Sequence, residues 1–116
     1  MTHLADAIYD VLRATRPSNR REITYTDLIS RLPAQFSNIA PDGELLAGAL
    51  GELVTGCRNK GIPAISAMVI RADTRVPGNG YYPMAHPNEA HDDALRMIAW
   101  GNELLKVRQF AYPPKL

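Results

Sequence analysis

The 116-residue sequence predicts a mostly α-helical domain with one small β-hairpin, in the α+β class. Several segments carry apolar residues at spacings of three and four, which is typical of amphipathic helices. One short β-branched segment before a glycine-rich turn is typical of a strand and hairpin instead. The composition, 46% hydrophobic and 22% charged, is that of a globular chain, and at this length we expect a single domain over residues 1–116.

Apolar periodicity predicts two helices in the first third of the chain. One covers residues 3–15, and we expect Pro17-Ser18-Asn19 to end it. After a brief extended stretch, Thr24 and Asp27 have the spacing of a capping box, so a second short helix is expected over residues 25–32. The inward stripe of the first helix consists of Leu4, Ala7, Ile8, Val11 and Leu12.

The third helix has the strongest periodicity in the chain. Asp42 is the expected N-terminal cap, and Gly61 is suited to end the helix because glycine tolerates the left-handed backbone that follows a last turn. The outward face carries three glycines, and a surface of such small residues allows another backbone to approach closely. The predicted inward face consists of Leu45, Leu46, Ala49, Leu50, Leu53, Val54 and Cys57.

The period then changes from helical to extended. Residues 64–70 predict a strand. Residues 73–80 contain Pro77-Gly78, which suits a type II turn, so Tyr81-Tyr82 is expected to begin the returning strand of a hairpin. A final helix is predicted over about residues 88–108. Its expected inward stripe consists of Ala90, Ala94, Ile98, Gly101 and Leu105.

Three helices followed by a two-stranded hairpin are the layout of a winged helix, here with an added C-terminal helix. Within this layout lie a tyrosine at the start of a short helix, a small-residue helix, a proline-led strand and a glycine-rich turn. These motifs are Tyr25-Thr26-Asp27-Leu28, Ala49-Leu50-Gly51-Glu52-Leu53, Asn59, Ile62-Pro63-Ala64-Ile65 and Gly80-Tyr81. This block, about half of the chain, resembles the DNA-binding half of O6-alkylguanine-DNA alkyltransferases and alkyltransferase-like proteins, which implies a shared winged-helix scaffold.

The resemblance does not extend to alkyl transfer. The reactive Pro-Cys-His-Arg of the alkyltransferases would fall at Ile65-Ser66-Ala67-Met68, and their helix-borne arginine at Gly48. Cys57 cannot substitute, because it lies on the predicted inward face of its helix. The sequence also has no nucleophile elbow, no Cys/His arrangement and no metal-ligand spacing, so we expect no enzyme, no cofactor and no metal.

Two functions are compatible with this sequence. The first is a small DNA-binding protein, in which the end of the third helix and the hairpin contact duplex DNA. The second is a protein-interaction module, for instance an accessory or phage-type adaptor, and it is favoured by the net charge of only +1 and by Glu52 on the outward helix face. The candidate DNA-contacting residues are Thr55, Arg58, Asn59, Lys60, Arg71 and Arg75.

The final helix also predicts a homodimer. A second apolar stripe lies beside the inward one, and its large side chains are of types enriched in interfaces. The alternatives are that Phe110 and Tyr112 fold back over Trp100 within one chain, or that the helix is buried on two sides. No apolar stretch is long enough to span a membrane and no signal peptide is visible, so a cytoplasmic protein without a membrane partner is expected. The predicted dimer contacts are Met97, Trp100, Leu104 and Val107.

Overall fold

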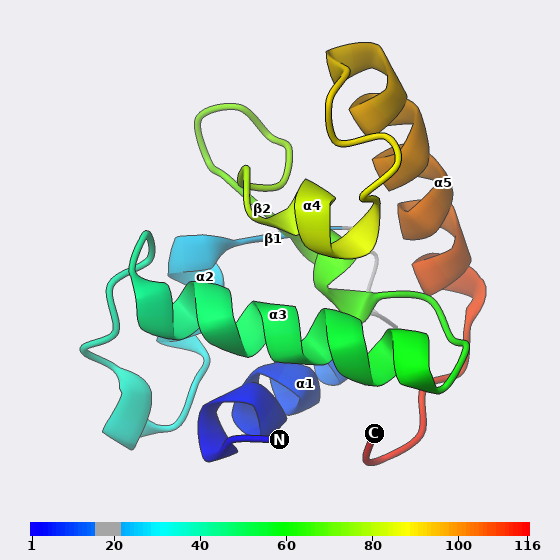
Figure 1. Ribbon diagram of the computed structural model, residues 1–116. Helices are drawn as coiled ribbons and strands as arrows, with labels where there is room; N and C mark the ends of the chain where they lie inside the picture. Colours follow the sequence, from blue (N-terminus) through cyan, green and yellow to red (C-terminus); the bar gives the residue numbers. More distant parts are fainter. Residues whose placement is uncertain (16–21) are drawn as a thin grey trace.

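The computed structural model describes residues 1–15 and 22–116, and it has the predicted mostly helical α+β character. With η marking a 3-10 helix, its elements are α1 (His3–Thr15), β1 (Ile23–Thr24), α2 (Tyr25–Ser30), η1 (Ala34–Phe36), α3 (Glu44–Asn59), η2 (Ile65–Met68), β2 (Val69–Ile70), α4 (Tyr81–Ala85) and α5 (Asp93–Gln109). In Figure 1, α3 crosses the front of the molecule, α1 packs against it from below, and α5 stands at one side. The expected end of the first helix, Pro17-Ser18-Asn19, lies outside the described residues.

One hydrophobic core joins α1, α2, α3 and η2. The inward face predicted for α3 is confirmed at Leu46, Ala49, Leu53, Val54 and Cys57, which are all buried. Leu45 was expected inside and is 71% exposed, and Leu50 is half-buried. The covered face of α3 is thus narrower than the periodicity predicts, because the helix packs from one side only and leaves Leu45 outside the contact.

Of the three predicted helix-end signals that lie in the described residues, two are confirmed. The Oγ1 of Thr24 accepts a hydrogen bond from the backbone N–H of Asp27 at 3.1 Å, which caps α2. Gly61 follows the last turn of α3 with a φ of 68°, the left-handed conformation that glycine adopts without strain. The prediction for Asp42 is wrong. The cap residue of α3 is Gly43, which has no side chain to accept a hydrogen bond, and Asp42 is exposed on the surface.

The predicted hairpin is wrong. The strand β2 pairs in parallel with β1, so that Ile23 lies opposite Val69 and Thr24 opposite Ile70. The first part of the expected strand is the 3-10 helix η2, and Tyr81 begins α4 instead of a returning strand. The strand predicted over residues 64–70 is confirmed at β2. Its partner β1 lies far away in the sequence, and local patterns do not determine which distant segment a strand pairs with.

The loop over residues 71–80 takes the place of the expected hairpin turn. The backbone N–H of Arg71 donates to the carbonyl of Val76 at 2.8 Å, which closes the loop on itself. The N–H of Gly78 then donates to the Tyr25 hydroxyl at 2.8 Å, which ties the loop to α2. With these two contacts the chain returns toward α3 as a loop. It forms no strand paired with β2 on this side.

The last helix begins later than predicted and turns its other face inward. It starts at Asp93 and not near residue 88, with the Asp92 side chain accepting from the N–H of Leu95 at 2.9 Å. Within α5 the predicted inward stripe is exposed, with Ile98 at 61% and Leu105 at 51%, whereas Ala90 precedes the helix and is half-buried against the core. Both faces of this helix are apolar with helical spacing, so periodicity alone could not decide between them.

The residues proposed for dimer contacts therefore need correction. Leu104 and Val107 are buried in the core of their own chain. Trp100 is half-buried and its Nε1–H donates to the carbonyl of Ala67 at 2.8 Å. Met97 is 42% exposed and is thus the one of the four that a partner can reach extensively. The side of α5 with Trp100, Leu104 and Val107 packs into its own chain, with α5 lying against η2.

Gly48 offers a test of how α3 is packed. A Cβ built at Gly48 meets nothing within 4 Å, so Gly48→Ala should raise the free energy of unfolding by up to about 1 kcal/mol through helix propensity. The matched control is Gly61→Ala, which places a side chain at φ 68° and should lower stability by a similar ~1 kcal/mol. Urea denaturation of both variants measures the two signs, and a destabilising Gly48→Ala would show that this face of α3 is covered.

Candidate functional site

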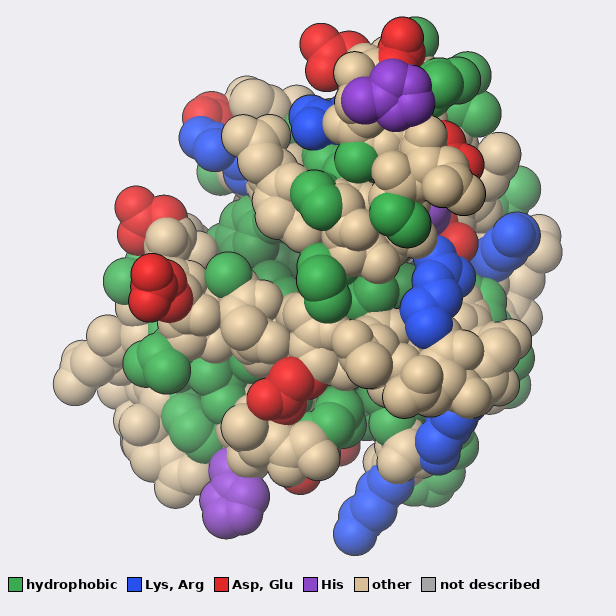
Figure 2. All heavy atoms as spheres, in the orientation of Figure 1, with side chains coloured by type: hydrophobic (Ala, Val, Ile, Leu, Met, Phe, Trp, Pro, Cys, Tyr) green, Lys and Arg blue, Asp and Glu red, His purple; other side chains and the backbone are tan. Residues whose placement is uncertain are grey.

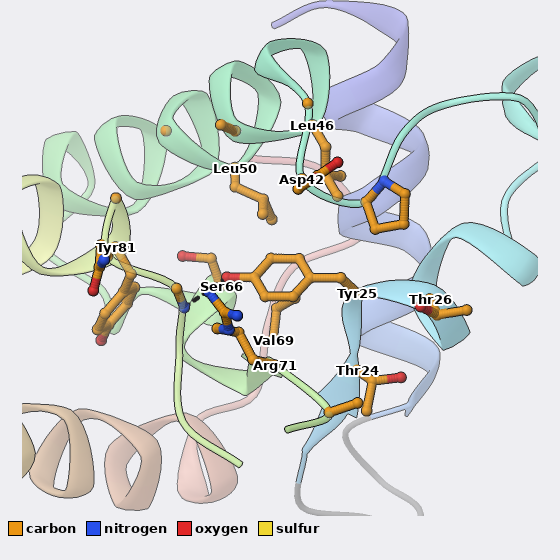
Figure 3. A pocket seen from close by; sticks show the side chains of 18 of the residues that line it. Thr24, Tyr25, Thr26, Asp42, Leu46, Leu50, Ser66, Val69, Arg71 and Tyr81 are labelled. Atoms are coloured by element: carbon orange, nitrogen blue, oxygen red, sulfur yellow. Dashed lines mark hydrogen bonds between the residues drawn. The ribbon is translucent and has the colours of Figure 1, made fainter. Parts of the chain in front are cut away.

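A pocket of about 690 Å³ opens between α3 and the loop over residues 71–80. Its lining comes from segments far apart in the sequence: the start of α2, the first half of α3, η2 with β2, and the 71–80 loop (Figure 3). This volume lies in the range of small-molecule and cofactor sites. We therefore take the pocket as the candidate functional site.

The side of the pocket formed by α3 is apolar. Figure 3 shows Leu46 and Leu50 pointing from α3 into the pocket, with Val69 on the opposite side. Met84 of α4 adds a flexible apolar side chain to the lining and is 47% exposed. Such walls favour a guest with flat or rounded apolar faces, because its burial removes apolar surface from water.

Tyr25 brings a hydroxyl group to the pocket. Its ring extends across the pocket toward the 71–80 loop in Figure 3, and its oxygen accepts the hydrogen bond from the Gly78 N–H. A Cβ at Gly78 would lie 2.8 Å from this oxygen, so glycine is needed for the contact. Burial raises the pKa of Tyr25 above its ordinary value, which keeps the phenol neutral with its own proton still to donate.

Ser66 brings a second hydroxyl group to the pocket, and this group has no protein partner. The residue is 4% exposed, and within the described part of the chain its Oγ makes no hydrogen bond. A buried hydroxyl left unpaired costs about 1–3 kcal/mol, so the fold retains Ser66 at an energetic loss. Ser66 lines the pocket, but the Oγ atom itself is covered by its own chain, so neighbouring atoms must shift before a guest can pair with it.

The charged groups at the pocket nearly neutralise one another. Arg71 donates two hydrogen bonds to the Asp73 carboxylate, at 2.9 and 3.0 Å. This paired guanidinium lowers the pKa of Asp73 to about 2, so the pair remains ionised at neutral pH. Asp42 adds a carboxylate to the lining. The site therefore suits a neutral guest better than a free anion.

The six predicted DNA-contacting residues do not form one patch. Thr55, Asn59 and Lys60 are exposed toward the C-terminal end of α3, whereas Arg71 lines the pocket beside its first half and Arg75 follows on the loop. On the face drawn in Figure 2, the basic side chains on the right, toward the C-terminal end of α3, lie apart from the basic side chain at the upper left. The expectation that hairpin and helix end share one basic edge is wrong, because the hairpin that would join them does not form.

Arg58, the sixth predicted residue, contacts two other helices of its own chain. Its Nη2 donates to the carbonyl of Ala85 at 2.7 Å, and its Nη1 lies 3.3 Å from Glu103 Oε2. The same carboxylate oxygen accepts the backbone N–H of Ala64 at 2.7 Å. Arg58 therefore links α3, α4 and α5, and its guanidinium is already engaged by acceptors of its own chain.

Behind the pocket, Tyr81 contacts a buried histidine. Its hydroxyl lies 2.8 Å from His86 Nε2, and His86 is 8% exposed. Burial lowers the pKa of His86 below its ordinary value, and the nearby Arg58 acts in the same direction, while Glu103 opposes them. The neutral imidazole is thus the form that the folded chain prefers.

This preference predicts a loss of stability in mild acid. As pH falls from 7 through the ordinary histidine value of about 6.5, the unfolded chain takes up a proton that folded His86 resists. The free energy of unfolding should therefore decrease between about pH 7 and pH 5, and His86→Gln should remove this part of the dependence. Urea titrations at several pH values measure it, and an unchanged dependence in His86→Gln would refute this explanation.

The composition of the site does not indicate a metal. Among residues 1–15 and 22–116, no group of three or more His, Cys, Asp or Glu side chains could hold a metal ion. In the same part of the chain, no helix is long and apolar enough to cross a membrane.

Comparison with protein-family models, curated proteins and solved structures found no match to this chain. The assignment of the site consequently rests on its geometry. The sequence analysis singled out Tyr25 and Gly80-Tyr81 in the resemblance but attached no role to their side chains. The sequence assigns no role to Ser66 either, although the resemblance places it where the alkyltransferases carry their reactive cysteine; the available signal was a polar residue inside an otherwise apolar segment over residues 64–70.

Proposed function

We propose that this chain is a non-enzymatic DNA-binding protein that keeps the three helices of a winged helix without its hairpin, and that it holds one unpaired base in the pocket. The observation that carries the proposal is a pocket with apolar walls and two hydroxyl groups, those of Tyr25 and Ser66. A base outside its stack has two apolar faces and a hydrogen-bonding edge, and proteins that bind such a base enclose it in a pocket of this kind.

The walls and the hydroxyl groups match different parts of a base. Leu46 and Leu50 offer apolar contacts to its faces. Tyr25 still has its proton to donate, and the Ser66 hydroxyl can donate or accept, so the two can pair with ring nitrogens, carbonyl oxygens or amino groups at the edge. A base would thereby satisfy the hydroxyl that the chain itself leaves unpaired.

A shallow groove along α3 supplies a path for the rest of the nucleic acid. Ala47, Gly51 and Met84 line both this groove and the pocket. The groove continues to Thr55 and Asn59, two of the residues expected to contact DNA. Because its floor consists largely of small side chains, a sugar-phosphate backbone can approach α3 closely.

The charges of this path predict weak dependence on salt. Arg71 is neutralised by Asp73, and the exposed Arg75 and Lys60 are the cations best placed for phosphate contacts. With about two phosphates neutralised, the logarithm of the binding constant should fall with the logarithm of salt concentration at a slope of about −2. Most of the affinity would then come from the base in the pocket.

A binding role is also supported by the surroundings of Ser66. A serine acts as a nucleophile when an adjacent side chain serves as general base and accepts its proton. Within the described part of the chain the Ser66 Oγ has no hydrogen-bond partner, so no side chain is in place to accept that proton. We therefore propose that the pocket binds its guest without catalysing a reaction. The cytoplasmic location expected from the sequence remains a prediction.

The proposal is tested by comparing two labelled duplexes of the same sequence, one fully paired and one with a single unpaired central base. The unpaired base has already lost part of its stacking, which otherwise costs a few kcal/mol, so fluorescence anisotropy should show at least about 10-fold tighter binding to that duplex. Equal affinity for both duplexes would contradict the role of the pocket, and absence of binding to either would contradict DNA binding altogether.

A protein-interaction module is the second candidate, and the charge of the groove favours it. Glu52 lies in the groove, where its carboxylate accepts hydrogen bonds from the backbone N–H and the hydroxyl of Thr2. An acidic residue repels a phosphate backbone, and the net charge of the chain is only +1. The pocket would then receive an apolar or aromatic side chain of a partner protein, and neither duplex would bind.

A further inference from the structure

The exposed side of α5 carries an apolar stripe that the core does not use. Ala94, Ile98, Gly101 and Leu105 are all exposed on this side, with Ile98 at 61% and Leu105 at 51%. Their spacings of four, three and four residues place them in one line along the helix, which is the seam of paired helices. We propose that two copies of this chain associate through this stripe, α5 against α5, in antiparallel orientation.

The order of large and small side chains favours a two-fold axis at the midpoint between residues 99 and 100. Ile98 and Gly101 are equally far from this midpoint, and so are Ala94 and Leu105. An antiparallel pair about this axis therefore sets each large side chain against a small one of the partner. A parallel pair in register would instead oppose large to large and small to small, which holds the helices apart and leaves gaps beside the small residues.

The charges at the two ends of α5 favour the same orientation. Asp92 and Asp93 lie at its start, whereas Lys106 lies in its last turn, near Arg108, which is paired with Glu22 of the same chain. Antiparallel pairing brings the acidic start of each helix toward the basic end of the other, and parallel pairing would bring like charges together. This complementarity points to a second copy of the chain as the occupant of the stripe.

The size of the surface predicts a weak dimer. Leu95 and Met97 widen the stripe, with exposures of 41% and 42%. A helix of 17 residues is about 25 Å long, so one helix pair offers less than the ~800 Å² per partner of a standard interface. We therefore expect dissociation constants of tens of micromolar, which correspond to ~6 kcal/mol of binding free energy.

Sedimentation velocity of the full chain, up to about 200 micromolar, tests the association. The wild type should shift from monomer to dimer, and Ile98→Lys should weaken the dimer at least about 10-fold, since it places a charge in the seam. Leu45→Lys is the matched control, because Leu45 is 71% exposed on α3 and should leave the dimer intact. A monomer at every concentration, or equal effects of the two substitutions, would overturn the proposal.

Gly101→Leu separates specific packing from general stickiness. It enlarges the apolar surface, so a merely sticky face would associate more strongly. In the two-fold arrangement the added side chain collides with Ile98 of the partner subunit, and the dimer should weaken. Stronger association of Gly101→Leu would therefore contradict the proposed packing.

Disulfide cross-linking tests the orientation, in a Cys57→Ala background that removes the natural buried thiol. Mixed Ala94→Cys and Leu105→Cys chains should cross-link with each other, because the two positions face one another across the axis. Either variant alone should not, since identical positions lie about 16 Å apart along the helices, too far for a disulfide. Efficient cross-linking of Ala94→Cys with itself would show a parallel pair, and no cross-link in the mixture would exclude this register.

Discussion

Glu103→Ala is expected to lower the free energy of unfolding by about 1–3 kcal/mol, mainly because it leaves a buried N–H without an acceptor. The loss of the ion pair adds less, because the Arg58 side chain is 42% exposed. Glu103 is 5% exposed, and one of its oxygens accepts both the Ala64 N–H and the Arg58 guanidinium. Without the carboxylate, the fully buried N–H of Ala64 has no acceptor and Arg58 loses its counter-charge. Urea denaturation monitored by circular dichroism measures the change.

Two further variants identify the origin of this loss. Glu103→Gln keeps an acceptor for the Ala64 N–H and removes only the charge facing the partly exposed Arg58, so it should cost no more than about 1 kcal/mol. Asn102→Ala, next to it on the exposed side of α5, should change stability by no more than about 0.5 kcal/mol. A Glu103→Ala variant as stable as the wild type would mean that Arg58 and Ala64 find other partners.

Leu50→Trp is expected to reduce binding of the duplex with an unpaired base at least about 100-fold, because the indole fills the space where the base would lie. Leu50 is half-buried and opens toward the pocket, so the larger side chain can enter the pocket without displacing the core of α3. Anisotropy gives the affinity, and circular dichroism verifies that the variant remains folded.

Leu45→Trp is the matched control on the same helix. Leu45 is 71% exposed and does not line the pocket, so this variant should bind like the wild type. Undiminished binding by folded Leu50→Trp would show that the nucleic acid binds elsewhere. A parallel loss in both variants would implicate the surface of α3 in general.

The sequence predicted the local features of the fold well. Residues 3–15 form the expected helix, and the capping contact of Thr24 and the glycine end at Gly61 are both observed. Each of these features depends on residues within a few positions of one another, where spacing and side-chain chemistry carry the information.

The errors concern contacts between distant segments. The strand at Val69–Ile70 pairs with Ile23–Thr24, and no local pattern distinguishes this parallel pairing from a hairpin with Tyr81-Tyr82. On α5, two apolar faces have equal periodicity. The face that packs is the one with Trp100, whose indole N–H finds a carbonyl on η2, and with the buried Glu103, a charge that sequence rules place outside.

The candidate site was predicted only in fragments for the same reason. Its walls come from α2, α3, η2 and the 71–80 loop, which meet only in the folded chain. The basic residues predicted DNA contacts at the end of α3. In the structure, however, Arg58 is paired with Glu103 and Arg71 with Asp73. The unpaired hydroxyl of Ser66 is a property of three-dimensional packing and is invisible in a list of residues.

The most direct test of the central claim is an NMR titration of the labelled full chain with the duplex that carries one unpaired base. The account predicts that the largest changes in backbone amide shifts occur around the pocket, at Ser66, Gly78 and Gly80, with smaller ones at Thr55 and Asn59 along the groove. Changes confined to the end of α3, at Asn59 and Lys60, with the pocket amides unmoved, would contradict it.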